Sequence, residues 1–472
     1  MEPTFDPATH DWFFCGIGGS GMLPLAQIVH GLGGRVAGSD RSRDQGRTAA
    51  KFAWLEDHGY RLTPQDGSGI VSKQQLVVAS AAVEGTVPEI VRATALGCVR
   101  MTRADLNAAL FNAAEMGVAI AGTSGKSTVT AMLAWILHAA GRQPTVMNGA
   151  VMKNFISPAN PFASAQVGSK ALYVSEVDES DGSIALYRPG VGILLNVSLD
   201  HKTMEELRGL FGNYLAASTT AVINADDPEA LAMTARAPDA LLFGLSSDRA
   251  MITVLPGTLT EKRTSLAATV VDRRDGGHHP LALAMPGRHN LSNALAAVAG
   301  ASAAGVSVGE AVRLLATFAG LARRFEIVGT SVGGVTVIDD FGHNPEKCAA
   351  TLRTLRAHPG RVIAFFQPHG YGPLRQMGRE LAETFAHELE AGDVALICDP
   401  LYFGGTVERD DGAAKVAEAI NSLGGNAEHH AGRNDVADRI VAIARPGDRV
   451  AIMGARDDTL TEFAKDLLAR LP

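Results

Sequence analysis

The stretch VAIAGTSGKSTVTAMLAWILHAAG, residues 118–141, decides the fold of this chain. An apolar run of strand character leads into a short loop that contains Gly-Lys-Ser, and apolar residues then recur at helical spacing. A glycine loop between a strand and a helix directs backbone N–H groups toward phosphate. The loop departs from the full Walker spacing, because Ile120 occupies the position of its first glycine. We expect Lys126 to reach terminal phosphates and the Ser127 hydroxyl to bind Mg²⁺.

A second glycine loop lies near the N-terminus, in FFCGIGGSGM at residues 13–22. Gly16, Gly18 and Gly21 form a G-x-G-x-x-G pattern after a predicted strand and before a predicted helix. Asp40 ends the next predicted strand, about 20 residues further on. The pattern suits the diphosphate of a UDP-sugar as well as that of NAD, and a glycine-rich turn without a ligand is the alternative. Two such loops predict two phosphate-bearing ligands.

Strand-like and helix-like patterns alternate along most of the chain. This alternation predicts an α/β protein whose parallel sheets are covered by helices. A second series of units starts near Ala114 and a third near Leu321, whereas residues 248–283 resemble antiparallel strands joined by turns. A chain of 472 residues is too long to fold around a single hydrophobic core, so roughly two to four domains are expected.

The composition argues against several classes of protein. Lys and Arg total 42 against 50 Asp and Glu, a net charge of −8 without a basic run, so nucleic acid is not an expected partner. No apolar run of about 18 residues and no signal peptide is found, which predicts a cytoplasmic protein without a membrane span. The four cysteines lack a C-x-x-C pair and are expected to be buried thiols rather than metal ligands.

Acidic and polar side chains follow the predicted strands downstream of the Gly-Lys-Ser loop. SEVDESDGS contributes Glu176, Asp178, Glu179 and Asp181, and NVSLDH contributes Asn196, Asp200 and His201. Because the carboxyl ends of parallel strands meet at one edge of a sheet, these groups are expected to share a site with the loop. Carboxylate oxygens suit Mg²⁺. A solvated acidic loop and a structural histidine are the alternative interpretations.

Further polar groups lie in the second half of the chain. PGRHNLSNALAA, residues 286–297, is predicted to start a helix with polar groups at its N-terminal end, and ordinary caps are the alternative interpretation of Ser292 and Asn293. RRFE and DDFGHNP add Arg324, Asp339, Asp340, His343 and Asn344. An arginine beside ATP would neutralise the charge that develops in phosphoryl transfer.

These motifs resemble the Mur ligase family, the ATP-dependent amide-bond-forming enzymes of peptidoglycan synthesis. GTSGKST, DESDGS, DH, NADDP, PGRHNLSNALAA, RRFE and DDFGHNP occur in the order of the family, over essentially the whole length. The resemblance implies an α/β protein of three domains. They are a Rossmann-like UDP-sugar-binding domain at 1–115, a central P-loop ATPase-like parallel sheet that binds ATP at 116–318, and a C-terminal Rossmann-like domain at 319–472 that closes over ATP and the amine.

The resemblance also implies site residues. The implied UDP-sugar-binding residues are Gly16, Ile17, Gly18, Gly19, Ser20, Gly21, Met22, Asp40 and Ser80. ATP binding falls to Gly122, Thr123, Ser124, Gly125, Lys126, Ser127, Thr128, Asn290, Asn293, Arg324 and Asp339. The implied Mg²⁺ ligands are Ser127, Glu176 and His201, and the implied catalytic residues are Lys126, Glu176, His201 and His343. The amine would meet His369 and Arg375.

The implied reaction activates the lactyl carboxylate of UDP-N-acetylmuramate as an acyl phosphate, which an amine then attacks. GIGGSGM, DESDGS and FQPH look most like the branch that adds L-alanine. Within FQPHGYGPLRQM, however, Gly370 stands where that branch has an arginine, and Arg375 is expected to supply the carboxylate fork from a loop that glycines and a proline redirect. The alternatives are another amino acid, a muramyl tripeptide in recycling, an idle nucleotide-sugar-binding paralogue or an NAD-dependent oxidoreductase. A monomer or homodimer is expected.

Overall fold

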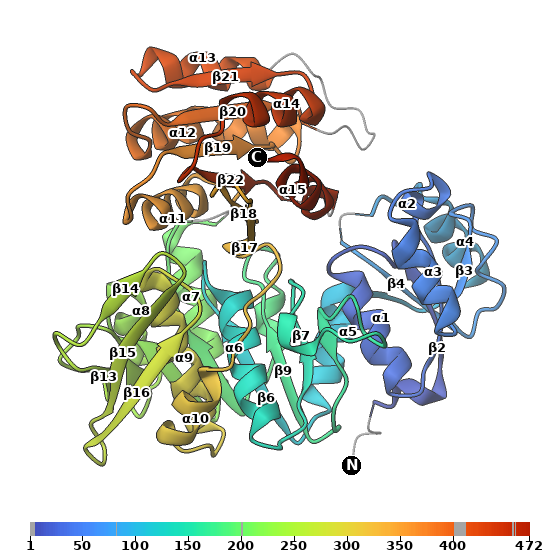
Figure 1. The fold of residues 1–472 in the computed structure, drawn as a ribbon. Coiled ribbons are helices and arrows are strands. Elements are labelled where there is room, and N and C mark those ends of the chain that lie inside the picture. The colour runs from blue at the N-terminus through green and yellow to red at the C-terminus, as the bar shows by residue number, and fades with distance from the viewer. Residues whose placement is uncertain (1–4, 82, 200–201, 401–411, 456, 458) are drawn as a thin grey trace. The chain divides into compact units, whose positions relative to one another are not determined.

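The computed structural model describes residues 5–81, 83–199, 202–400, 412–455, 457 and 459–472 (Figure 1). The chain divides into two compact units, each described separately below. The first unit comprises Met1–Thr260, Leu266–Ala284 and Arg288–Gly320, and the second comprises Glu261–Ser265, Met285–Gly287 and Leu321–Pro472. No helix of the described ranges is long and apolar enough to cross a membrane.

The first unit opens with a five-stranded parallel sheet in the order β3-β2-β1-β4-β5. The central strand β1 carries Trp12, Phe13 and Phe14, all of which are buried because helices cover both faces of the sheet. The strands are β1 (Asp11–Cys15), β2 (Arg35–Ser39), β3 (Arg61–Thr63), β4 (Gln75–Ala79) and β5 (Arg100–Thr102). The helices are η1 (Pro7–Thr9), α1 (Met22–Gly31), α2 (Arg41–Asp44), α3 (Ala49–Asp57), α4 (Pro88–Leu96) and α5 (Arg103–Asn112).

A larger sheet of eleven strands follows in the same unit, in the order β14-β15-β13-β12-β11-β10-β6-β9-β7-β8, with β16 beside β15. Its strands are β6 (Met116–Ala121), β7 (Thr145–Met147), β8 (Ala165–Gln166), β9 (Leu172–Glu176), β10 (Val191–Leu194), β11 (Thr220–Asn224), β12 (Leu241–Phe243), β13 (Ile252–Val254), β14 (Thr260–Lys262), β15 (Ser265–Asp272) and β16 (Gly277–Leu283). The strands β13, β15 and β16 pair antiparallel, as the sequence predicts for residues 248–283.

The helices of this part are α6 (Lys126–Ala139), η2 (Lys153–Phe155), η3 (Ser183–Leu186), α7 (Met204–Ala216), α8 (Pro228–Ala232), η4 (Met233–Ala235), α9 (Arg288–Ala303) and α10 (Val308–Leu315). The helix α6 is buried over most of its length, and α9 packs beside it. Its apolar character at helical spacing is therefore the signature of a core helix.

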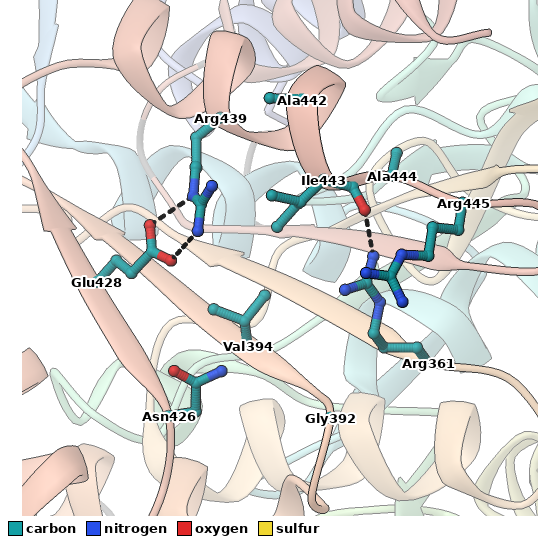
Figure 2. Close-up of a pocket in the computed structure, with 10 residues that line it drawn as sticks. All are labelled: Arg361, Gly392, Val394, Asn426, Glu428, Arg439, Ala442, Ile443, Ala444 and Arg445. Atoms are coloured by element: carbon teal, nitrogen blue, oxygen red, sulfur yellow. Dashed lines mark hydrogen bonds and ion pairs between the residues drawn. The ribbon is translucent and has the colours of Figure 1, made fainter.

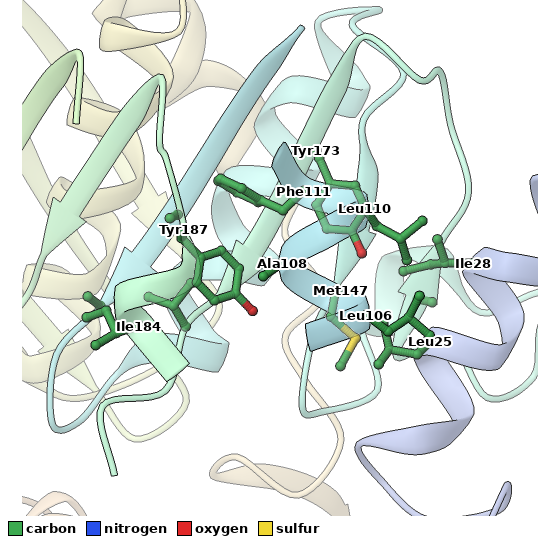
Figure 3. Close-up of a cluster of buried hydrophobic side chains, with 14 of the residues drawn as sticks. Leu25, Ile28, Leu106, Ala108, Leu110, Phe111, Met147, Tyr173, Ile184 and Tyr187 are labelled. Carbon is green, nitrogen blue, oxygen red and sulfur yellow. The ribbon is translucent and has the colours of Figure 1, made fainter. Parts of the chain in front are cut away.

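One hydrophobic cluster joins the two sheets of the first unit (Figure 3). Leu25 and Ile28 come from α1 and Phe111 from α5, while Met147 and Tyr173 come from the larger sheet. The ring of Phe111 lies edge-on to that of Tyr173, with the ring centroids 5.9 Å apart. Buried apolar area of this kind is the main stabilising contribution to packing, so α5 is an integral part of the core of this unit.

The second unit contains a six-stranded sheet in the order β17-β18-β22-β19-β20-β21, parallel except for β17. The strands are β17 (Glu326–Thr330), β18 (Thr336–Asp340), β19 (Val362–Phe366), β20 (Val394–Cys398), β21 (Ala427–His430) and β22 (Arg449–Met453). Helices cover both faces, α11 (Pro345–Arg356), α12 (Tyr371–Glu388) and α13 (Ala413–Ser422) on one, and α14 (Arg433–Ile443) and α15 (Thr459–Arg470) on the other.

A pocket of about 330 Å³ opens at the amino ends of β19 to β21 (Figure 2). Arg439 forms an ion pair with Glu428 there, and the guanidinium of Arg361 donates to the Ile443 carbonyl oxygen at 2.5 Å. The polar residues of the sequence motifs lie instead at the carboxyl ends of the strands, where open parallel sheets bind ligands. The pocket is therefore separate from the motif residues of this unit.

Candidate active site

The Gly-Lys-Ser loop joins β6 to α6, as the sequence predicts. Gly122 has φ +137° and Gly125 has φ +87°, a conformation that favours glycine. A Cβ atom on Gly125 would also lie 2.7 Å from Oδ1 of Asn293. The chain therefore enters α6 in a conformation that a larger side chain would obstruct, and the first turn of α6 directs its N–H groups into the loop.

Residues that follow β10, the neighbour of β6 in the sheet, fix the conformation of this loop. Asn196, which follows β10, accepts from the Ser124 N–H through Oδ1 at 2.9 Å and donates through Nδ2 to the Ser124 carbonyl oxygen at 3.0 Å. The hydroxyl oxygen of Thr123 accepts from the Ser198 N–H at 3.0 Å. The sequence places Asn196 near the loop but does not reveal this bracing role, which depends on β10 pairing with β6.

Lys126 is held by groups of the protein. Its Nζ donates to the Gly122 carbonyl oxygen at 2.6 Å and to Oε2 of Glu179 at 2.8 Å. Burial raises the pKa of Glu179, although the charge of Lys126 acts in the opposite direction. Burial also opposes the ionisation of Asp178, but the charge of Lys126 and hydrogen bonds from Ser180 bring its pKa below the usual value. The ammonium group of Lys126 is therefore paired with Glu179, and its charge also acts on Asp178.

Ser127 and Glu176 lie together, as expected for groups that share a metal ion. The Ser127 hydroxyl donates to Oε2 of Glu176 at 2.7 Å. Gly149, which no sequence motif indicates, leaves space beside this carboxylate, since a Cβ there would lie 2.3 Å from Oε1 of Glu176. The neighbouring Asn148 is fully buried and donates to the Ser127 carbonyl oxygen at 3.1 Å. A hydroxyl and a carboxylate are oxygen ligands that fit Mg²⁺, which keeps several waters.

Three other predicted residues belong to this edge. Asp200 and His201 lie outside the described residues. Thr128 is buried in the first turn of α6.

The helix α9 brings two asparagines toward the loop. The alternative interpretation of Ser292 and Asn293 as caps is wrong, because α9 begins at Arg288 and both residues lie inside it. The Asn293 side chain instead approaches Gly125, and its Nδ2 donates to Oδ1 of the buried Asn290 at 3.5 Å. Both predicted ATP-binding asparagines therefore stand on one face of a helix next to the phosphate loop.

The first glycine loop joins β1 to α1. Gly16 has φ +75°, and its N–H donates to the Ser39 carbonyl oxygen at 2.8 Å. Oδ2 of Asp40 accepts from the Gly18 N–H at 2.8 Å, while its Oδ1 accepts from the Ser42 N–H at 2.8 Å. Asp40 thus fixes the loop and caps α2, two contacts that the spacing alone does not indicate.

The other predicted residues of this loop differ in accessibility. Gly19 and Ser20 are exposed, whereas Ile17, Gly18 and Met22 are buried. Ser80 follows β4, which pairs parallel with β1. It therefore lies at the same carboxyl edge of the sheet as the glycine loop.

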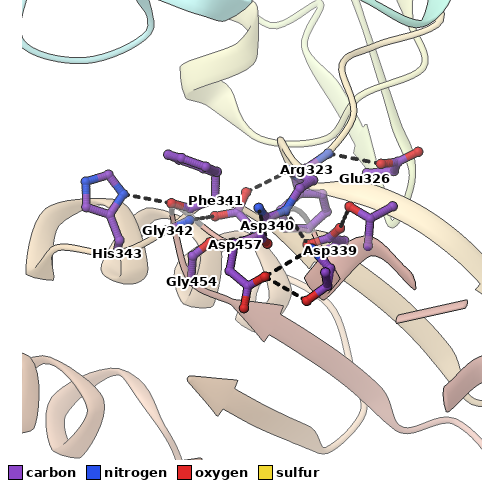
Figure 4. A network of polar contacts seen from close by, with 12 residues as sticks. Arg323, Glu326, Asp339, Asp340, Phe341, Gly342, His343, Gly454 and Asp457 are labelled. Atoms are coloured by element: carbon purple, nitrogen blue, oxygen red, sulfur yellow. Dashed lines mark hydrogen bonds and ion pairs between the residues drawn. The ribbon is translucent and has the colours of Figure 1, made fainter. Parts of the chain in front are cut away.

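In the second unit, Arg323 and Asp339 form the centre of a buried polar network (Figure 4). Arg323 donates to Oδ1 of Asp339 at 3.3 Å and to the carbonyl oxygens of Gly454 at 2.6 Å and Asp457 at 3.0 Å. Burial raises the pKa of Asp339 to about 6, although the charge of Arg323 opposes this shift. The residue predicted from the RRFE motif is the adjacent Arg324, whose guanidinium lies 4.9 Å from the centre of the Phe341 ring. Arg323 is thus buried and hydrogen-bonded within the network, whereas Arg324 is only half-buried.

The two histidines of this edge lie near each other. Nδ1 of His343 lies 2.9 Å from the Phe341 carbonyl oxygen, and the ring centroids of His343 and His369 are 5.2 Å apart. Burial lowers the pKa of His343 to about 3, so its ring is neutral.

The segment after His369 differs from the expected loop, because α12 begins at Tyr371 and includes the exposed Arg375. Pro373 lies in the first turn, where the helix needs no N–H donor, so proline and glycine permit a helix here. Arg433 is a further polar residue of this edge that no sequence motif indicates. This residue donates to Oε1 of Gln367 at 2.5 Å and pairs with the carboxylate of Asp457.

Three models of one protein family match successive parts of this chain. The model described as Mur ligase family, catalytic domain matches residues 13–115, the Mur ligase middle domain matches 120–301, and the Mur ligase, glutamate ligase domain matches 323–456. The chain belongs to the Mur ligase family. Members are ATP-dependent ligases that form an amide bond, and this Mur ligase is one of them.

Curated relatives share about a third of this sequence. The UDP-N-acetylmuramate–L-alanine ligase of Pelotomaculum thermopropionicum is 35% identical over 457 residues, which cover 94% of each chain. The ligase of the same name from Agrobacterium fabrum is 33% identical over 473 residues, covering 97% of this chain and 96% of the relative.

Two solved structures share the fold of this Mur ligase. The UDP-N-acetylmuramate-alanine ligase of Thermotoga maritima has a TM-score of 0.78 at 23% identity, and the murein peptide ligase of Psychrobacter arcticus has a TM-score of 0.71 at 23% identity. Each similarity covers 98% of both chains. The Rossmann-like and P-loop-like sheets predicted from the sequence are thus those of Mur ligases.

Proposed function

We propose that this Mur ligase joins the lactyl carboxylate of UDP-N-acetylmuramate to L-alanine, using ATP, in the synthesis of peptidoglycan precursors. The observation that carries the proposal is the set formed by Lys126, Ser127 and Glu176 at the carboxyl edge of the central sheet. The first glycine loop, in the same unit, would bind the UDP diphosphate. The names of the curated relatives support alanine as the amine.

The chemistry needs two steps, because a carboxylate is a poor electrophile toward an amine. A carboxylate oxygen attacks the γ-phosphorus of ATP, ADP leaves, and an acyl phosphate forms. The amine nitrogen then attacks the acyl carbon, and inorganic phosphate leaves with the bond to oxygen. The loop N–H groups and Lys126 would hold the phosphates, while Ser127 and Glu176 would hold Mg²⁺, with His201 proposed as a further ligand. Bound Mg²⁺ neutralises charge on the transferred phosphoryl group.

The proposal extends to the remaining predicted residues. Arg324 and Asp339 would serve ATP, and His343 would act near the reacting groups. The amine would meet His369 and Arg375. The domain boundaries 1–115, 116–318 and 319–472, a monomer or homodimer, and a cytoplasmic location where ATP is available belong to the same proposal. A muramyl tripeptide is the second candidate amine, favoured by the fold shared with a murein peptide ligase.

Phosphate release tests the proposal. The enzyme is supplied with ATP, Mg²⁺ and UDP-N-acetylmuramate and is offered L-alanine, glycine, L-serine or muramyl tripeptide. We expect L-alanine to give the highest kcat/KM. Release with the tripeptide but not with L-alanine would assign the enzyme to recycling, and no release with any amine would contradict ligation.

Arg375→Ala, with the exposed Arg379→Ala as control on the same helix, tests the amine site. Arg375→Ala removes the guanidinium that would bind the carboxylate of alanine. We expect KM for alanine to rise roughly tenfold, since about 1.4 kcal/mol corresponds to a factor of ten. KM for ATP should not change. An unchanged KM for alanine in Arg375→Ala would exclude this arginine from the amine site.

A further inference from the structure

Arg103 lies over the first glycine loop. It is the first residue of α5, directly after the N-cap Thr102 and within the capping box that Thr102 forms with Asp105. A Cβ atom on Gly21 would lie 2.8 Å from Cδ of Arg103 and 3.5 Å from its Nη1. Gly21 is the N-cap of α1, the helix whose N-terminal N–H groups face the loop. The guanidinium therefore stands beside the N-terminus of α1, and glycine at position 21 leaves room for it.

The same side chain is close to the acidic segment of the larger sheet. Burial opposes the ionisation of Asp178, and Lys126 and Ser180 favour it most, but the charge of Arg103 also lowers the pKa of Asp178. The charge of Arg103 likewise acts on the buried Tyr187. Arg103 is thus near enough to Asp178 and Tyr187 for its charge to act on both groups.

Asn107, one turn further along α5, fixes this position. It is buried, and its Nδ2 donates to Oγ of Ser175 at 3.0 Å and to the hydroxyl oxygen of Tyr187 at 2.8 Å. Its Oδ1 accepts from the hydroxyl of Tyr173 at 2.9 Å. Ser175 directly precedes Glu176 on β9. A saturated buried network of this kind holds a helix in one register, so the start of α5 has a defined place relative to both loops.

Arg103 is partly exposed, and within the described ranges no hydrogen bond or ion pair engages its guanidinium. Two other arginines of this part of the chain form ion pairs, Arg35 with Asp11 and Arg43 with Glu56. A planar arginine fork suits the oxygens of a phosphate in two parallel charge-assisted bonds.

We propose that Arg103 binds the diphosphate of the UDP-sugar, opposite the backbone N–H groups of the first glycine loop. The inference rests on the proposed function for the identity of the ligand. It assigns to α5 a substrate-binding residue that lies outside the glycine motif. The diphosphate would then contact the N-terminus of α1 on one side and a side chain anchored to the larger sheet on the other.

Calorimetry with UDP, UDP-N-acetylglucosamine and UDP-N-acetylmuramate tests the assignment with Arg103→Ala, Arg103→Lys and the exposed Arg100→Ala as matched control. We expect Arg103→Ala to weaken all three ligands by a similar factor of roughly tenfold or more, since charge-assisted bonds are the strong ones. Arg103→Lys should lose less, and Arg100→Ala should bind like the parent. The affinity for a non-hydrolysable ATP analogue, which should not change, reports that each variant is folded.

Unchanged UDP binding in Arg103→Ala would overturn the proposal. So would a loss confined to UDP-N-acetylmuramate, because the arginine would then recognise the lactyl carboxylate. If Arg103→Ala does not fold, Arg103→Lys decides, and UDP affinity equal to that of the parent counts against the diphosphate contact. UDP binding requires no turnover. The binding result therefore tests the role of Arg103 even if no amine is ligated.

Discussion

Oε2 of Glu179 lies 2.8 Å from Nζ of Lys126, in an ion pair whose carboxylate is almost fully buried. The lysine expected to contact ATP is therefore held by a protein anion. A phosphate group that binds Lys126 competes with this carboxylate, and the free energy of the ion pair opposes nucleotide binding.

Glu179→Gln should tighten ATP binding. The amide retains the shape of the side chain but removes the competing charge, so we expect the Kd of a non-hydrolysable ATP analogue to fall by roughly threefold to tenfold, about 0.7–1.4 kcal/mol. Asp181→Asn removes the same charge from an exposed position of the same segment and serves as control. Weaker nucleotide binding in Glu179→Gln would show that the carboxylate assists ATP rather than competing with it.

Lys126→Ala should abolish turnover while UDP-N-acetylmuramate still binds. The side chain contributes charge at the phosphate loop of the larger sheet, whereas the UDP-sugar is assigned to the first glycine loop. Calorimetry and phosphate release measure the two properties, with the exposed Lys170→Ala as control. An equal loss of UDP-sugar binding would contradict the assignment of two ligands to two loops.

Glu176→Gln should raise the Mg²⁺ concentration needed for half-maximal activity. An amide oxygen is a weaker ligand for Mg²⁺ than a carboxylate, so the midpoint of a magnesium titration should increase several-fold, by about 1 kcal/mol. The exposed Asp239→Asn provides a control with the same change of charge. If both variants have the midpoint of the parent enzyme, Glu176 has a structural role only.

His343 should make stability fall in acid. Its pKa is lowered from 6.5 to about 3, so below pH 6.5 the unfolded chain binds a proton that the folded protein does not. Stability therefore decreases as the pH falls from about 6.5 toward 3, by about 2 kcal/mol at pH 5. Urea unfolding between pH 5 and 8 should show a smaller decrease for His343→Asn than for the parent. The exposed His387→Asn should show the same dependence of stability on pH as the parent. If His343→Asn also shows the parent's dependence, the pKa of His343 is not lowered.

Local signals explain why the sequence predicts the two strand–loop–helix units correctly. The apolar run, the glycines and the helical spacing are contiguous in the chain, so neither unit depends on distant pairing. The same is true of the antiparallel strands after residue 248, which short turns connect.

Long-range contacts explain what the sequence could not reveal. The bond from the Gly18 N–H to Asp40 spans 22 residues, and the bracing of Ser124 by Asn196 spans 72. Both depend on which strands become neighbours. The helix α12 was missed for a different reason, since Gly372 and Pro373 interrupt a helix but are tolerated in its first turn.

The bracing of the phosphate loop by Asn196 has a consequence for the thermodynamics of nucleotide capture. The chain loses the conformational entropy of this loop when it folds, because Asn196 secures both backbone groups of Ser124. ATP then meets a rigid receptor, and little of its interaction energy is consumed in ordering the polypeptide. The Ser124 amide, already engaged, is also removed from the set of donors available to phosphate. Recognition thus falls to the N–H groups that follow it in the chain.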